Sequence, residues 1–395
     1  MPVLPPQLRI LHLTSSLKIG GAETVLVSLL RELAGSQSLI TVNQVLYFHA
    51  GPQVAALQAL AQTHPATCYS PQQIQGQICL YDPRFWWCLY WQTRRFQPDL
   101  IHSQLWSANI AARILGKLLG VPVINTLHSP VITNGPFEGL RLGLTKLSYY
   151  CRRLCDWLTV KWAARLVAVS PSTARALAPD CRGQALVVIS NGVAIGDLRL
   201  LPARSHFTIG CVGRLVASKN FGAVLVSLAE LAPKYPHLRL IVLGTGPLEL
   251  ELKQQAQALG VADLVQWLVT PDVAAYYPQF DCLVQPSWYE GLSLALLEAG
   301  AAGLPCIVSG ANGHDLITDQ VNGLLVGLDA AAALTAAIER LILDPQLRVN
   351  LGHNLRTLIA QKYSLAAMVA QYQQLYLAVW RPSQRQNLAA TREFK

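Results

Sequence analysis

The stretch PSWYEGLSLALLEAGAAGLP, residues 286–305, decides how the second half of the chain is interpreted. It follows an apolar run at residues 282–284 and predicts a turn and then a helix that begins near Leu292. The amino end of a helix carries partial positive charge and unpaired amides, so this turn favours an anion such as phosphate. Glu290 precedes the helix, Glu298 lies about two turns into it, and helical side chains lean towards the amino end. Both carboxylates can therefore face one ligand.

Short apolar runs alternate with helix-length stretches along the whole chain. They lie at residues 8–13, 40–47, 100–101, 121–125 and 166–169, and again at 208–212, 238–243, 264–268, 282–284 and 306–309. Such alternation predicts parallel strands joined by crossover helices, and its restart predicts two doubly wound α/β units. A chain of 395 residues can form two domains, each with its own core.

The same rhythm predicts the domain boundaries. Residues 1–193 are expected to form a first Rossmann-like domain, and 194–205 a linker without a clear period. Residues 206–365 are expected to form a second Rossmann-like domain. A helix at 366–380 is expected to cross back to the first domain, and 381–395 to be a flexible tail.

The composition limits the class of protein. It is 52% hydrophobic and 13% charged, which excludes a chain dominated by disorder because so much apolar surface can be buried. The sequence shows neither a membrane-spanning run nor a secretory signal. Nine cysteines without a Cys-x-x-Cys pair predict reduced thiols and a cytoplasmic protein. The net charge of +9 favours anionic partners.

A basic turn follows the first apolar run of the second half and contains Gly213, Arg214 and Lys219. A diphosphate leaving group needs its developing charge neutralised, and a fixed arginine and lysine can do this without a metal ion. An ordinary solvated turn is the alternative. Gly244 and Gly246 follow the next apolar run, where they can bring the backbone close to a nucleoside or simply form a turn.

The first half carries weaker candidates. Gly20 and Gly21 stand between a predicted strand and a helix, where glycine lets a ligand approach the backbone, although any tight turn would also use them. His128 follows the apolar run at 121–125, at the edge of an open sheet where ligand groups gather. His102 ends another predicted strand. Either histidine can equally be a packed, hydrogen-bonded side chain.

These motifs together resemble the retaining glycosyltransferases of group 1, or family 4, which include enzymes similar to sucrose synthase and to phosphatidylinositol mannosyltransferase. Their signature is a glutamate, seven residues and a second glutamate, followed by a small-residue helix and Gly-x-Pro. Glu290, Glu298 and residues 303–305 match it, and the resemblance extends from about residue 8 to residue 365. It implies the GT-B fold, in which two Rossmann-like domains face each other across a cleft. By this resemblance, residues 1–193 would lie on the acceptor side and residues 206–365 would bind the donor.

The resemblance assigns roles in donor binding. Glu290 would orient the hydroxyls of the donor sugar, and Glu298 would accept hydrogen bonds from the ribose. The backbone amides of Gly291, Leu292 and Ser293 would be offered to the donor.

The charged groups and the first domain also receive roles from the resemblance. Arg214 and Lys219 would clamp the pyrophosphate. His128 would approach the transferred sugar from the acceptor side, and the loop of Gly20 and Gly21 would face the phosphates and the acceptor.

The base pocket is where this chain departs from the family pattern. Leu268 would line that pocket, together with the loop of Gly244 and Gly246. Val269 stands where many relatives have glycine, and residues 310–315 replace the commoner Gly-Gly-x-x-Glu. The donor's base and sugar are therefore not assigned.

The function implied by the resemblance is a hexosyltransferase. It would move a sugar from a nucleoside diphosphate sugar, of the UDP or GDP type, to a hydroxyl with retention of anomeric configuration. The acceptor would be a glycolipid, a lipid-linked precursor or a polysaccharide precursor of the cell envelope. The sequence contains no Asp-x-Asp, His-Glu-x-x-His or Gly-x-Ser-x-Gly motif, so we expect neither a metal ion nor a further cofactor.

Three alternatives remain at this point. A sugar-nucleotide 2-epimerase would share the two-domain plan, and a non-catalytic, membrane-associated partner of a transferase would share the binding residues. A dinucleotide oxidoreductase is disfavoured because the glycine fingerprint Gly-x-Gly-x-x-Gly is missing.

Two segments combine basic and aromatic residues. Residues 84–96 hold three tryptophans and three arginines, and residues 140–165 interleave basic residues with Leu, Tyr and Trp. Such helices suit an anionic bilayer surface, which predicts a peripheral protein on the inner face of the plasma membrane. The alternative is a pair of crossover helices with buried apolar faces. No nucleic-acid-binding module accompanies the charge, so nucleic acid is not an expected partner.

Overall fold

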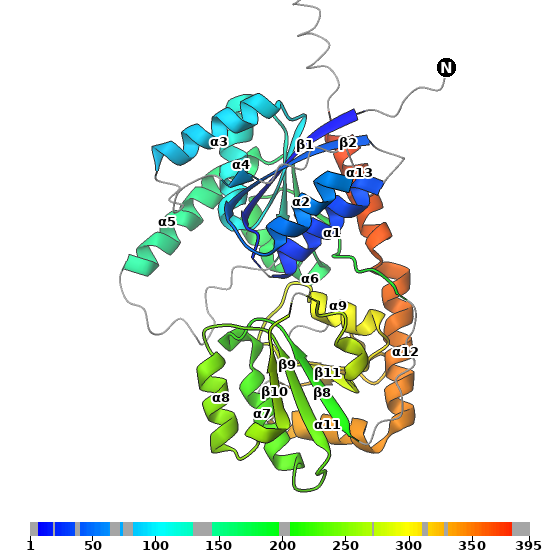
Figure 1. Cartoon of the computed structure of the whole chain (residues 1–395). Coiled ribbons are helices and arrows are strands. Elements are labelled where there is room, and N and C mark those ends of the chain that lie inside the picture. Colours follow the sequence, from blue (N-terminus) through cyan, green and yellow to red (C-terminus); the bar gives the residue numbers. More distant parts are fainter. Residues whose placement is uncertain are drawn as a thin grey trace, which may run out of the picture. The chain divides into compact units, whose positions relative to one another are not determined.

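The structure is a computed structural model that describes residues 7–18, 20–35, 40–63, 72–73, 82–128, 144–196, 206–270, 272–309, 315–327 and 331–380. The chain divides into two compact units, Met1–Ser190 with Met368–Lys395, and Asn191–Ala367. Each unit is a parallel sheet flanked by helices (Figure 1). The predicted fold class, two doubly wound α/β units, is confirmed.

The first unit is built on a parallel sheet in the order β3-β2-β1-β4-β5-β6-β7. Its strands are β1 Gln7–Ser16, β2 Ile40–His49, β3 Gln72–Gln73, β4 Leu100–Gln104, β5 Val123–Leu127, β6 Arg165–Ala168 and β7 Leu186–Val188. The order reverses between β1 and β4. Open sheets bind ligands at such a switch point, outside the carboxyl ends of the strands.

The helices of the first unit are α1 Gly21–Gly35, α2 Gln53–Thr63, α3 Pro83–Phe96, α4 Trp106–Leu119, α5 Leu144–Thr159, α6 Pro171–Leu177 and α13 Leu365–Val379, of which residues 368 onwards belong to this unit. Side chains alternate between the two faces of a strand. On β1, Leu11 and Leu13 pack with Phe85 of α3 in one apolar cluster. His12 lies between them, fully buried, on the other face.

The second unit has a parallel sheet in the order β10-β9-β8-β11-β12-β13. Its strands are β8 Phe207–Val212, β9 Leu238–Leu243, β10 Val265–Leu268, β11 Cys282–Gln285, β12 Cys306–Ser309 and β13 Leu324–Val326. Its helices are α7 Phe221–Leu231, α8 Glu249–Ala258, α9 Leu294–Ala301, α11 Ala331–Leu343 and α12 Pro345–Lys362. The switch point of this sheet lies between β8 and β11.

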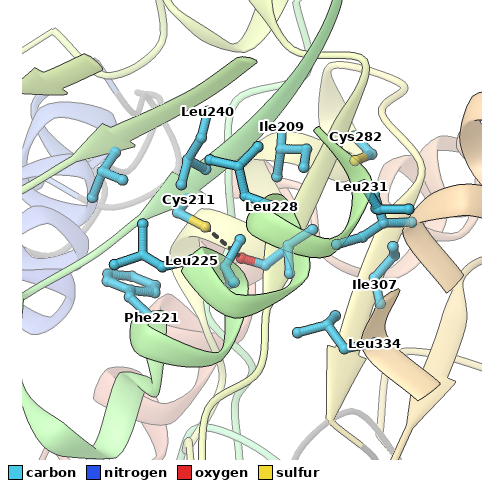
Figure 2. Packing of buried hydrophobic residues seen from close by; sticks show 14 of the residues in the cluster. Ile209, Cys211, Phe221, Leu225, Leu228, Leu231, Leu240, Cys282, Ile307 and Leu334 are labelled. Atoms are coloured by element: carbon cyan, nitrogen blue, oxygen red, sulfur yellow. Dashed lines mark hydrogen bonds between the residues drawn. The ribbon is translucent and has the colours of Figure 1, made fainter. Parts of the chain in front are cut away.

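Helix α7 covers one face of the second sheet. Phe221, Leu225 and Leu228 follow the spacing of one helical stripe, and they lie against strand residues such as Ile209 and Leu240 (Figure 2). The Cys211 thiol lies in the same cluster, where it donates to the carbonyl of Val284 at 3.4 Å. This core holds the strand ends that carry the candidate site.

The small residues after Glu298 have a packing role. A Cβ atom on Gly352 of α12 would lie 1.9 Å from the carbonyl oxygen of Gly303, just after α9. Only glycine allows so close an approach of α12 to this turn. Within the quoted stretch, a Cβ atom on Gly300 of α9 would lie 2.3 Å from Cδ1 of Ile359 on α12, so the glycine at this position is explained by the contact between α9 and α12.

The sequence predicted that helix α9 begins near Leu292, but in the structure it begins at Leu294. Ser293 has an extended backbone, with φ −71° and ψ 119°, and its hydroxyl accepts from the amide of Leu296 at 3.4 Å. A serine with this geometry caps a helix and does not belong to its first turn.

Strands β3, β7 and β13 were not predicted from the sequence. They have two, three and three residues, which is too short for a strand to show its period.

Several predicted segments fall partly outside the described residues. These are 197–205 of the linker, 310–314 after β12, 140–143 of the second basic segment, and 381–395 of the tail. Within the described residues, no helix combines the length and the apolar character needed to cross a membrane.

Candidate functional site

The loops after β8 and β11 meet at the switch point of the second sheet. Lys219 is the last residue of a 3-10 turn, Ala217–Lys219, in the loop after β8, and Glu290 lies in the loop after β11. The Lys219 ammonium donates to Oε1 of Glu290, and each side chain is 18% exposed. The fold thus joins two predicted site residues at the edge where open sheets bind ligands.

Two further side chains hold Glu290. Gln285 Nε2 donates to Glu290 Oε1 at 2.9 Å, and the Ser287 hydroxyl donates to the same oxygen at 3.0 Å. Gln285 in turn accepts from the hydroxyl of Ser293 at 2.9 Å, and the Ser309 hydroxyl donates to the carbonyl of Ser287. Because these supporting groups are buried, Glu290 is held in one position before any ligand arrives.

The same residues line a recess next to the amino end of α9. Its lining comprises Gln285, Ser287, Glu290, Gly291, Leu292, Ser293, Leu296, Val308, Asp315 and Leu316. Four predicted residues, Glu290 to Ser293, therefore lie together at a helix end that favours an anion.

Two glycine loops border this site. Gly213 and Gly244 have φ of 149° and 148°, which favour glycine. A Cβ atom on Gly244 would lie 1.9 Å from the carbonyl oxygen of Gly213, so the loops after β8 and β9 pack backbone against backbone. Gly246 packs in the same way against Leu215, and the Gly244 amide donates to the carbonyl of Leu268 at 2.9 Å. Both glycine loops and Leu268 are thus brought together.

Arg214 follows Gly213 and is exposed. Among the described residues it has no ion pair or side-chain hydrogen bond, whereas Lys219 is paired with Glu290. The structure therefore places Lys219, and not Arg214, against the predicted sugar-binding carboxylate.

Glu298 lies in α9 and is half-buried. Its Oε2 accepts from the hydroxyl of Tyr277 at 2.7 Å, and burial raises the pKa of Glu298 above its ordinary value while this hydrogen bond opposes the rise. Tyr277, Gln285 and Ser287 escaped the sequence analysis. Ser287 lies inside the quoted stretch, but no spacing marks any of the three as a partner of a glutamate.

His128 of the first unit lies just after β5. Its Nε2 is 2.9 Å from the amide oxygen of Gln104 at the end of β4. Burial lowers the pKa of His128 to about 4, so the ring is neutral at pH 7. With an acceptor facing Nε2, the hydrogen is on that atom and Nδ1 keeps its lone pair. His128 can accept a proton through Nδ1.

Gly20 precedes helix α1, which Gly21 opens. The Glu23 side chain, 8% exposed, folds back over Gly20 and accepts from the hydroxyl of Ser16. A Cβ atom on Gly20 would lie 2.5 Å from a Glu23 oxygen. The glycine here makes room for a carboxylate of the protein itself.

His102 is a packed side chain. It is fully buried in β4, where Nδ1 is 2.7 Å from the hydroxyl of Tyr376 and Nε2 is 2.8 Å from Oγ1 of Thr126. Both ring nitrogens are therefore used inside the first unit. No cluster of His, Cys, Asp or Glu within the described part of the chain could hold a metal ion.

Comparison with known families covers both units. Residues 19–196 match the family described as Glycosyltransferase Family 4, and residues 201–358 match the family described as Glycosyl transferases group 1. The chain is 28% identical over 319 residues to the Escherichia coli UDP-Gal:alpha-D-GlcNAc-diphosphoundecaprenol alpha-1,3-galactosyltransferase, covering 73% of this chain and 78% of that protein. It is 30% identical over 286 residues to D-inositol 3-phosphate glycosyltransferase of Pseudarthrobacter chlorophenolicus. That match covers 66% of this chain and 67% of that protein.

Solved structures share the fold. HepE from Anabaena, crystallised with UDP, has a TM-score of 0.75 at 21% identity. The match covers 94% of this chain and 100% of the HepE chain. Sucrose-phosphate synthase from Thermosynechococcus elongatus has a TM-score of 0.76 at 20% identity, with 97% and 100% covered. From the family matches, the relatives and this architecture, the chain belongs to the group 1 glycosyltransferases of the GT-B fold.

Proposed function

We propose that this protein transfers a hexosyl unit from a UDP or GDP sugar to a hydroxyl acceptor with retention of anomeric configuration. The pairing of Lys219 with Glu290 at the switch point, beside the amino end of α9, is the observation that supports it most. A relative whose name includes UDP-Gal and a neighbour crystallised with UDP support a nucleotide sugar as donor. Retention rests on the resemblance to the family.

The proposed chemistry follows from where the charges lie. The bond between the anomeric carbon and the diphosphate oxygen breaks, and a bond forms between that carbon and the acceptor oxygen. The acceptor proton passes to the leaving diphosphate. Arg214, Lys219 and the amino end of α9 would stabilise the charge on that group, so no metal ion and no further cofactor is required.

Two variants test the donor site. Arg214→Ala and Lys219→Ala are each expected to lower transfer about 100-fold, because each removes a charge that stabilises the leaving group. Arg239→Ala, an exposed arginine at the amino end of β9, is the control. Turnover of a UDP and GDP sugar panel is measured with and without EDTA, and NMR reports the anomeric configuration of the product. Undiminished transfer by Arg214→Ala would contradict the proposed role of Arg214 in binding the pyrophosphate. Loss of transfer in EDTA would contradict the proposal that no metal ion is required.

The alternatives are separated by the acceptor. An epimerase would change the donor sugar without an acceptor, and a non-catalytic partner would bind UDP without turnover. Incubation of the donor alone, followed by chromatography of the sugar, identifies an epimerase. Sugar transfer after an acceptor is added distinguishes a transferase from a non-catalytic partner.

His128 is proposed to serve the acceptor. Its neutral ring with a free Nδ1 lone pair, the consequence of burial and of Gln104, supports that role. His128→Ala is expected to lower transfer about tenfold, because the lone pair of Nδ1 no longer accepts a hydrogen bond that orients the reacting hydroxyl, with UDP affinity unchanged. A parallel loss of UDP affinity would contradict the assignment.

We further propose a lipid-linked or glycolipid acceptor of the cell envelope, reached at the inner face of the plasma membrane. Helix α3 buries Phe85 and Leu89 but leaves Trp87 and Trp91 exposed, at 67% and 46%. Arg94 lies 5.7 Å from the ring of Trp91. Aromatic rings with arginine beside them suit the headgroup level of an anionic bilayer.

Helix α5 presents a second such face. Arg113 of α4 is fully buried and fixes α5 by donating to the carboxylate of Asp156. The exposed side of α5 carries Leu154, Trp157 and Leu158, each about half exposed. The helix is thus held by an ion pair with a buried arginine, while its apolar side chains remain in solvent, as membrane docking requires.

Sedimentation with vesicles tests this surface. Binding to vesicles rich in phosphatidylglycerol, weaker at high salt and absent for phosphatidylcholine vesicles, is the expected result. The double variant Trp157→Ala/Leu158→Ser is expected to reduce binding. Leu250→Ser, at a still more exposed residue of α8, is expected to leave binding unchanged. Absence of binding at both salt concentrations would contradict the proposal.

A further inference from the structure

Tyr277 anchors its ring in the apolar core of the second unit. It begins a short 3-10 turn, Tyr277–Gln279, just before β11, and is 2% exposed. Its ring packs edge-on against Phe280, with centroids 5.9 Å apart, in a cluster that includes Leu296 and Leu297 of α9. The ring is fixed on all sides, so the position of its hydroxyl is also fixed.

That hydroxyl holds one oxygen of Glu298. The Tyr277 hydroxyl donates to Glu298 Oε2 at 2.7 Å, a short hydrogen bond typical of an ionised acceptor. Among the described residues, Oε1 of Glu298 has no hydrogen-bond partner. The side chain is only half-buried, so Oε1 can reach a ligand while Oε2 is anchored.

Burying the Glu298 carboxylate beside Tyr277 costs free energy, because a charged group loses hydration when it is buried. Burial disfavours the charged form of Glu298 and raises its pKa. Burial, and after it the proximity of the Glu298 carboxylate, raise the pKa of Tyr277, which keeps the phenol protonated as a donor. A carboxylate held in a costly environment with one free oxygen is typical of a binding site.

We infer that Tyr277 is a positioning residue, which aims Glu298 at the ribose of the donor nucleotide and so determines the preference for ribonucleotides over 2′-deoxyribonucleotides. This inference rests on the proposed function, in which Glu298 accepts from the ribose hydroxyls. A carboxylate oxygen that is fixed in place loses little entropy when it binds a hydroxyl. A carboxylate free to rotate gains less from the same contact.

The effect of removing the phenol oxygen follows directly. In Tyr277→Phe the ring remains and only the hydrogen bond is lost. UDP affinity is expected to fall about three- to tenfold, the scale of one hydrogen bond. The affinity for 2′-deoxy-UDP is expected to fall less, because part of the contact with Glu298 is already missing. The ratio of the two affinities therefore decreases, and in transfer assays KM rises more than kcat falls.

Calorimetric titration of the full chain with UDP and with 2′-deoxy-UDP measures this ratio. Tyr235→Phe is the matched control, because the Tyr235 hydroxyl donates to Glu339 Oε1 at 3.0 Å elsewhere in the same unit. It is expected to leave both affinities unchanged. In a Glu298→Ala background, Tyr277→Phe is expected to have no further effect, since its influence acts through Glu298.

The outcomes separate this inference from the function on which it rests. Where wild-type protein binds GDP and not UDP, GDP and 2′-deoxy-GDP replace the uridine pair. Wild-type protein that binds neither UDP nor GDP, or Glu298→Ala that binds the accepted nucleotide as wild type does, would refute the ribose role of Glu298 and the inference with it. Loss of binding in Glu298→Ala, together with an unchanged affinity ratio in Tyr277→Phe, would refute the inference alone. Thermal unfolding of Tyr277→Phe, followed by circular dichroism, is measured beside the titration so that the ratio is taken on a folded variant.

Discussion

At the scale of single residues, Glu290 is fixed by side chains from separate segments. Lys219 comes from the loop after β8, Gln285 ends β11, and Ser287 follows it. All three donate to the same oxygen, so rotation of the carboxylate would break three hydrogen bonds. A carboxylate held in this way costs little reorganisation when a substrate binds.

Gln285→Leu tests this arrangement. The change removes one of the three donors to Glu290 Oε1 and the acceptor of the buried Ser293 hydroxyl group. Since Glu290 is proposed to bind the sugar and not the nucleotide, kcat is expected to fall about tenfold, with UDP affinity within about twofold of wild type. Steady-state kinetics and calorimetry measure the two quantities. Gln255→Leu on α8 is the control, because its amide donates only to the carbonyl of Gly222. An unchanged kcat would contradict the positioning of Glu290.

Spacing along the chain predicted part of this site and omitted the rest. The helix end and the basic turn have local signatures, and the structure brings Lys219 and Glu290 together although 71 positions separate them. Gln285 and Tyr277 have no such signature. Their roles depend on which strand lies next to which, and that is decided by packing.

At the scale of elements, α13 is joined to the sheet of the first unit by polar contacts. The Tyr376 hydroxyl is 2.7 Å from His102 Nδ1, and the Tyr372 hydroxyl is 3.0 Å from Thr126 Oγ1. The two tyrosines are four positions apart on one helical face. These hydrogen bonds, formed in a buried setting, determine the register of α13 on β4 and β5.

Tyr376→Phe is expected to destabilise the first unit by about 1–3 kcal/mol, because Nδ1 of buried His102 loses its partner. Tyr372→Phe is the control with a smaller expected effect, since Thr126 keeps its contact with His102 at 2.8 Å. Urea unfolding followed by circular dichroism measures both. Equal destabilisation by the two variants would contradict the special role of the pair between Tyr376 and His102.

The helices and strands were predicted from the sequence wherever they were long. Runs such as 208–212 and 238–243 are buried apart from Arg239 and correspond to β8 and β9. The start of α9 was placed two residues too early, because Ser293 is the cap and the apolar pattern continues through it. Strand β13 was missed because its three residues pair only at the end of the sheet.

At the scale of the whole molecule, the two units differ in their buried titratable groups: the first unit buries histidines and the second buries a glutamate. Burial lowers the pKa of His12 and His128 to about 4 and that of His102 well below 6.5, and all three lie in the first unit. In the second unit, burial raises the pKa of Glu298. Acidification therefore has a different consequence for each unit.

The sign follows from proton binding. Between pH 6.5 and about 4 the unfolded histidines bind protons that the folded first unit does not, so its unfolding free energy falls as the pH falls. The limit is about 1.4 kcal/mol per pH unit for each of the fully buried His12 and His102. Folded Glu298 binds a proton before its unfolded form does, so its contribution to the unfolding free energy of the second unit rises as the pH falls. Glu249 and Glu339, whose pKa values are lowered, remain charged above pH 4.5.

Scanning calorimetry of the full chain at pH 7.5, 6.5 and 5.5 is therefore expected to resolve two transitions that separate as the pH falls. The transition of the first unit moves to lower temperature, and that of the second stays or rises. UDP identifies the second transition by raising it, because a ligand of the folded state stabilises by mass action. His12→Asn is expected to reduce the pH dependence of the first transition, since one buried histidine is removed. Parallel movement of both transitions would show that these buried groups do not govern the acid response, and a first transition independent of pH would show that the histidines titrate alike in the folded and unfolded chain.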